Sequence, residues 1–77
     1  MSFLLPQTRT GVVASVRGVD LHGDRYIDLA VAVEGDGAPT MTGRISAMDC
    51  PADLEVGDRV AVRFTMGVMT RVERAPV

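Results

Sequence analysis

The sequence predicts an all-β domain of five short strands, and two observations support this prediction. Apolar and polar residues alternate with a period of two along most of the chain, which is typical of half-buried strands. Glycine-rich segments separate these alternating runs at short intervals, as turns do. A chain of 77 residues has room for one domain, so the strands are expected to share one core.

The alternation places the strands over five ranges: residues 11–19, 26–33, 40–46, 59–66 and 68–73. The run 59–66 has the clearest pattern, and it puts four apolar residues on the buried side: Val60, Val62, Phe64 and Met66. Residues 34–37 read as a tight turn, because their two glycines can adopt the positive φ that such turns require.

The segment 47–54 is expected to be an insertion, because Pro51 would interrupt a strand there. It has room for one short helical turn, with Asp49 as its cap and Pro51 in the first turn. Five strands with such an insertion after the third follow the order of an OB-type Greek-key barrel. We therefore predict an N-terminal extension over residues 1–9 and an OB barrel over 10–77.

Composition limits the chemistry that the chain can hold. The single cysteine excludes an internal disulfide, and one cysteine with one histidine cannot form a structural zinc site. We expect neither metal nor cofactor. Charge is uneven: the middle of the chain is acidic and its last third is basic, while the net charge is −2. Opposite patches of this kind favour either a solvated surface or recognition of a partner.

The chain has no apolar run of the length that a transmembrane helix needs, and the short run before Pro6 lacks the features of a signal peptide. We therefore expect a soluble, cytoplasmic protein with no membrane contact. This location also suits an unpaired cysteine.

Catalysis would need a nucleophile with a base in hydrogen-bonding reach, and Cys50 with His22 is the obvious pair. The two residues lie in different predicted loops, so we expect a structural cysteine and a surface histidine. The prediction is a protein that is not an enzyme by itself. A small enzyme with its pocket inside the barrel is retained as an alternative.

Single-stranded nucleic acid is the second alternative, because many OB barrels bind it with a basic groove and stacking aromatic residues. Only Tyr26 is a plausible stacker here, since Phe64 falls in the apolar register and the one remaining aromatic residue lies near the N-terminus. The negative net charge also opposes this function. Four arginines could still share one face: Arg17, Arg44, Arg59 and Arg63.

Residues 41–45 (MTGRI) and 49–64 (DCPADLEVGDRVAVRF) resemble a known family of OB domains. The family comprises acyl-CoA-associated proteins that carry a rubredoxin-like zinc ribbon before the barrel. Tyr26 matches a tyrosine near the start of the family's second strand, and the resemblance spans about residues 11–74. The two Cys-x-x-Cys pairs of the ribbon are absent, so only the barrel half can be compared.

The resemblance implies a non-catalytic accessory module that docks on a thiolase-like or ketosynthase-like enzyme acting on acyl thioesters. From the alternation of faces, Arg17, Tyr26 and Arg44 are candidates for binding an anionic group such as a CoA phosphate. The apolar N-terminal segment and the methionines of the late strands are the expected contact with that enzyme or with a second copy of the chain: Phe3, Leu4, Leu5, Met66 and Met69.

Overall fold

The computed structural model describes residues 6–75, which form one antiparallel sheet of five strands in the order β3-β2-β1-β4-β5. The prediction of an all-β protein is confirmed. The elements in chain order are β1 (Gln7–Leu21), β2 (Asp24–Val33), β3 (Thr40–Ser46), the 3-10 helix η1 (Ala47–Asp49), β4 (Arg59–Thr65) and β5 (Val68–Arg74).

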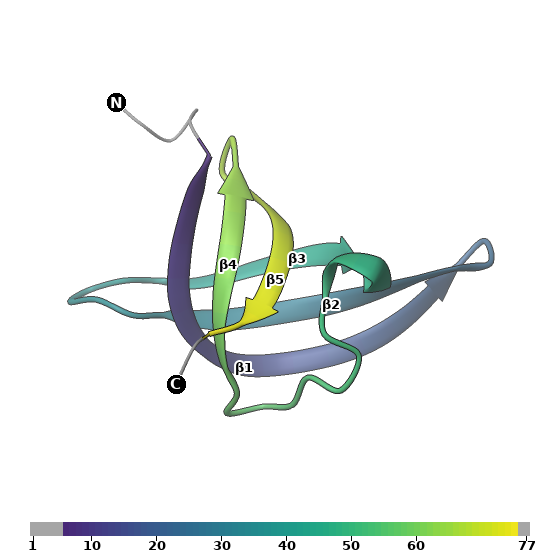
Figure 1. The fold of residues 1–77 in the computed structure, drawn as a ribbon, viewed down its shortest axis with the longest axis horizontal. Helices are drawn as coiled ribbons and strands as arrows, with labels where there is room; N and C mark the ends of the chain where they lie inside the picture. The colour runs from purple at the N-terminus through teal and green to yellow at the C-terminus, as the bar shows by residue number, and fades with distance from the viewer. Residues whose placement is uncertain (1–5, 76–77) are drawn as a thin grey trace.

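Strand β1 is long and sharply bent, and it holds the two parts of the sheet together (Figure 1). Its first half pairs with β4 and its second half with β2, and Gly11 is paired with both, opposite Val60 and Val33. A Cβ atom at Gly11 would lie 2.5 Å from the carbonyl oxygen of Ala32, so the bend requires glycine. A register shift between Val13 and Ser15 adds a bulge at the bend, where bulges increase the twist.

The bent sheet encloses one hydrophobic core, to which all five strands contribute. The edge strands β3 and β5 approach each other across this core, because Ile45 and Met69 belong to the same buried cluster. The two strands come close at Gly43, where an added Cβ would lie only 2.9 Å from the Cβ of Met69. In residues 6–75 the hydrogen-bonded ladder nevertheless ends at β3 and β5, so the sheet is open along this line.

Two hairpins close with two-residue turns, His22-Gly23 and Met66-Gly67, and all four residues have positive φ. Positive φ at both central positions is the requirement of a type I′ turn. The prediction that Met66 is buried is therefore wrong: the strand alternation stops at Thr65, and Met66 is 64% exposed in the turn.

The predicted helical turn is present as η1, but a different residue caps it. The side chain of Ser46 accepts a hydrogen bond of 3.2 Å from the backbone N–H of Met48, whereas Asp49 is the last helical residue. The sheet also begins earlier than expected. Gln7 pairs with Phe64, so the last three residues of the predicted extension belong to β1.

The connection between η1 and β4 is fastened to the sheet in two ways. Val13 exchanges backbone hydrogen bonds of 2.9 Å with Gly57 and Asp58. Arg74, at the end of β5, donates to Asp58 Oδ2 and Asp53 Oδ1 at 2.8 Å each and to the Asp53 carbonyl at 3.1 Å. One arginine thus joins the last strand to this loop.

Within residues 6–75, no helix combines the length and apolar character needed to cross a bilayer.

Candidate functional site

The outward face of β1, β2 and β3 carries two rows of polar or small side chains. The pairing register places Arg17 and Arg44 on either side of Asp28, and the bulge in β1 brings Ser15 opposite Ala30. Thr42 lies on the other side of Ala30. Because the inward positions of β2 are buried, as at Leu29 and Val31, its alternation directs Asp28 and Ala30 outward.

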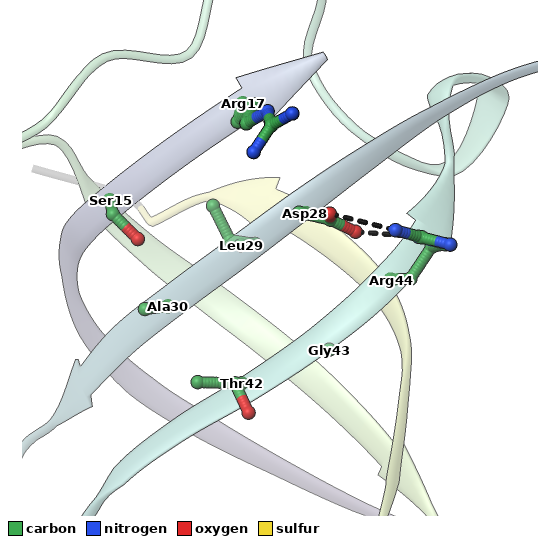
Figure 2. Close-up of a pocket in the computed structure, with 8 residues that line it drawn as sticks. All are labelled: Ser15, Arg17, Asp28, Leu29, Ala30, Thr42, Gly43 and Arg44. Carbon is green, nitrogen blue, oxygen red and sulfur yellow. Dashed lines mark hydrogen bonds and ion pairs between the residues drawn. The ribbon is translucent and has the colours of Figure 1, made fainter. Parts of the chain in front are cut away.

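These two rows border an open hollow of about 570 Å³ (Figure 2). The hollow exists because the side chains in its second row are small. Besides the two rows themselves, Leu29 and Gly43 contribute to its lining. An open hollow with polar side chains at its border can receive one side of a small molecule.

At one end of the hollow, Arg44 is held by Asp28. Its Nε and Nη2 atoms donate to Oδ1 and Oδ2 of Asp28 at 2.6 and 2.9 Å (Figure 2). This hydrogen bonding lowers the pKa of Asp28 and raises that of Arg44. Such a bidentate pair orients both side chains, and the carboxylate of Asp28 compensates the charge of Arg44.

Arg17 is the second cation of the site. It lies opposite Asp28 in the β1–β2 ladder, yet it forms no side-chain hydrogen bond or ion pair with any residue in the range 6–75. Its charge is among the smaller causes that lower the pKa of Asp28, after the hydrogen bond from Arg44. A guanidinium in this position can donate to an anionic group without first breaking an ion pair.

Tyr26, the third predicted ligand residue, lies one row further along β2, opposite Val19 and Ser46. It is half-buried, and it faces the same side as Asp28 without lining the hollow. The structure therefore brings Arg17, Tyr26 and Arg44 onto one face. Sequence reasoning missed Ser15, Asp28 and Thr42, because the register that aligns them was not readable from alternation alone.

The four arginines considered for nucleic acid are not gathered at one place on the sheet. Arg17 and Arg44 border the hollow, whereas Arg59 and Arg63 lie on β4, and Arg59 donates to both carboxylate oxygens of Glu34 at 2.9 and 3.1 Å. No continuous arginine surface is formed by these residues.

The predicted partner-contact residues fall into three groups. Met66 is exposed, and beside it Val68 is 62% exposed. Met69 is 3% exposed in the core, so its prediction as a contact residue is corrected: after the two-residue turn, its side chain packs inward beside Gly43. The remaining residues, Phe3, Leu4 and Leu5, lie outside the described residues.

Cys50 and His22 do not form a catalytic pair in the structure. His22 is exposed in the β1–β2 turn, while Cys50 follows η1 and packs against the core. Burial raises the pKa of the Cys50 thiol, which keeps it in the protonated, less nucleophilic form. In the part of the chain that the structure describes, no three acidic, histidine or cysteine side chains gather to hold a metal ion.

A scan of protein-family models and searches of curated proteins and solved structures found no match to this chain. The resemblance to acyl-CoA-associated OB proteins therefore stays a prediction.

Proposed function

We propose that this protein is a non-catalytic binding module whose outer β1-β2-β3 face holds a small ligand with an anionic group. One observation carries the proposal: Arg17, without an ion-pair partner in residues 6–75, stands at the border of an open hollow made by small side chains. The ligand class that the sequence resemblance suggests is coenzyme A or an acyl-CoA.

The chemistry of the hollow suits a phosphate at one end and a less polar group beside it. Arg17 can form charge-assisted hydrogen bonds to phosphate oxygens, and the hydroxyls of Ser15 and Thr42 can add further donors. Arg44 is expected to contribute less than Arg17, because two of its five N–H donors are already directed to Asp28. Ala30 and Gly43 leave room for an apolar or flat portion of the ligand.

A small ligand fits this face better than a nucleic-acid strand. Asp28 places a negative charge in the middle of the row, and Tyr26 is the single aromatic residue among the described positions of this face. Strand binding needs a basic groove and stacking platforms, and the chain as a whole carries a charge of −2.

We also propose that the bent sheet is an OB-type barrel. Two features support it: the strand order β3-β2-β1-β4-β5, and the approach of Gly43 on β3 to Met69 on β5. A pocket enzyme inside the barrel has less support, since the inner face is filled by hydrophobic side chains and no polar side chain is buried in residues 6–75.

An accessory role beside a thiolase-like or ketosynthase-like enzyme is the biological setting that we propose for the module. Its support is the resemblance, together with the neighbouring exposed apolar residues Met66 and Val68 on the β4–β5 hairpin. A second copy of the chain is the alternative occupant of this apolar position.

Calorimetric titration with coenzyme A tests the proposed ligand class. We expect saturable binding by the wild-type protein, and a loss of about tenfold or more in Arg17→Gln, since a hydrogen bond to a charged group contributes about 1.5–3 kcal/mol. Arg25→Gln is the matched control, because Arg25 is an exposed arginine paired with Asp20 outside the hollow. It should bind as the wild type does.

A single-stranded oligonucleotide provides the second titration. Binding that is strong at low salt and falls steeply with added salt would support the nucleic-acid alternative. Failure of the wild-type protein to bind coenzyme A would contradict the proposed ligand class.

A further inference from the structure

A second group of basic side chains lies on the outward face of β4 and β5, away from the hollow. The β4–β5 ladder places Arg63 directly opposite Arg71, and the β1–β4 ladder places Thr8 on the other side of Arg63. With Ala61 and Glu73 these residues border a separate open groove of about 380 Å³. In Figure 1 the strands concerned are the purple beginning of β1, then β4 and β5.

The two guanidinium groups are poorly compensated. Arg63 forms no ion pair with a residue in the described range, and Arg71 reaches only Glu73, with 3.8 Å between Nε and Oε2 and no hydrogen bond. The side chains of Arg71 and Glu73 are exposed, at 60% and 64%. Like charges directly opposite each other on a sheet are destabilising, so this arrangement costs the free protein stability.

The backbone at this point is also irregular. The register shifts between Arg63 and Phe64, which leaves Thr70 as the extra residue of a bulge on β5. The hydroxyl of Thr70 donates to the carbonyl oxygen of Arg63 at 3.2 Å and so fixes the bulge to the facing strand. Bulges redirect side chains and are frequent beside functional sites.

From these observations we infer that Arg63, Arg71 and Thr8 form a second anion site, which takes a phosphate group as inorganic phosphate or a phosphomonoester. Two guanidinium groups match the charge of a phosphate dianion, and each can donate two hydrogen bonds to its oxygens. The Thr8 hydroxyl is a further donor. Glu73 lies one row along and repels anions, so the phosphate sits in the row of Thr8, Arg63 and Arg71.

This site is separate from the hollow of the proposed function. Thr8 is near the beginning of β1 and Arg17 near its end, on the two sides of the bend. Loss of Arg17 is therefore expected to leave the second site unchanged, and the two proposals can fail independently.

Amide chemical shifts measured during a titration with sodium phosphate at pH 7.5 test the inference, with sodium chloride at equal ionic strength as the reference. We expect saturable shifts at Thr8, Arg63 and Arg71 in phosphate alone. Arg63→Gln and Arg71→Gln should each weaken binding about fivefold or more, whereas the control Arg25→Gln should bind normally. Identical shifts in chloride, or full binding by Arg63→Gln, would overturn the site.

The repulsion between Arg63 and Arg71 can also be tested by measuring the thermal stability of the protein. Without phosphate, Arg63→Gln should melt at a higher temperature than the wild type, because the repulsion is removed. With phosphate, the wild type should gain stability and Arg63→Gln should not. Equal phosphate stabilisation of the two proteins would count against the inference. A parallel titration with phosphoserine identifies the source: tighter binding of the ester indicates an organic ligand, and tighter binding of phosphate indicates the free ion.

Discussion

Asp28 accepts two hydrogen bonds of 2.6 and 2.9 Å from Arg44, and on its other side it faces Arg17, which has no ion-pair partner among residues 6–75. One carboxylate thus lies between two arginines and pairs with only one of them. For this reason our proposal assigns anion binding to Arg17. The carboxylate of Asp28 lowers the net positive charge at the hollow.

The first prediction concerns Asp28→Asn. Removing the carboxylate should release Arg44 toward the hollow and remove a charge that repels anions, so coenzyme A should bind severalfold more tightly. Calorimetric titration measures the change, and Asp20→Asn is the control because Asp20 pairs with Arg25 outside the hollow. Weaker or unchanged binding by Asp28→Asn would argue against an anion in this position.

The second prediction concerns the close approach of β3 to β5. Gly43→Ala should lower the free energy of unfolding by about 1–3 kcal/mol, because the new Cβ would lie 2.9 Å from the Cβ of Met69. Urea denaturation measures this loss. Gly18→Ala is the matched control: its new Cβ meets only the flexible end of Arg25, so the cost should be small. Equal stability of the two variants would contradict the packing of β3 against β5.

The third prediction concerns the β4–β5 turn. Met66 has a φ of 53° in an exposed turn, a conformation that asparagine adopts more readily than methionine. Met66→Asn should therefore stabilise the protein by about 1 kcal/mol, seen as a rise of about 4–8 °C in Tm. Met48→Asn removes another exposed methionine, which is 94% exposed and has no positive φ, and it should show no such gain.

The fourth prediction concerns acid stability. The pKa of Asp53 is lowered chiefly by its hydrogen bond from Arg74; that of Asp58 is lowered first by the Glu55 backbone N–H and then by Arg74. Because both values are depressed on folding, their stabilisation is present above the ordinary pKa of 3.8 and is lost as pH falls below it.

Arg74→Gln should consequently be less stable than the wild type at pH 7, and the difference should shrink as pH falls below about 4. Urea denaturation at pH 7, 5 and 3 measures both trends. Arg25→Gln serves as a control, because its ion pair with Asp20 is exposed on both sides and lies outside both proposed sites. A constant difference between wild type and Arg74→Gln at all three pH values would contradict the role of this ion-pair cluster.

The strands were predictable because apolar and polar residues alternate along much of the sheet, most clearly at Val60, Val62 and Phe64 of β4. The same alternation was enough to predict that Arg17 and Arg44 lie on one face. It failed at Met66, because a turn with positive φ interrupts the pattern, and at Met69, because the side chain of that residue packs into the core beyond the turn.

The detailed composition of the hollow could not be predicted, because it depends on long-range register. A single-residue bulge in β1 decides that Ser15 rather than Ala14 faces Ala30. The Asp28–Arg44 pair joins residues 16 positions apart, and the pairing of Arg63 with Arg71 depends on the bulge that follows it. Local sequence patterns do not determine such pairings.

The central claim is that the β1-β2-β3 face binds an anionic ligand through Arg17, and amide shift mapping with coenzyme A tests it most directly. We predict saturable shifts at Ser15, Arg17, Ala30 and Thr42 in the wild-type protein, and their loss in Arg17→Gln. Shifts confined to Thr8, Arg63 and Arg71, or the same shifts in Arg17→Gln as in the wild type, would contradict the claim.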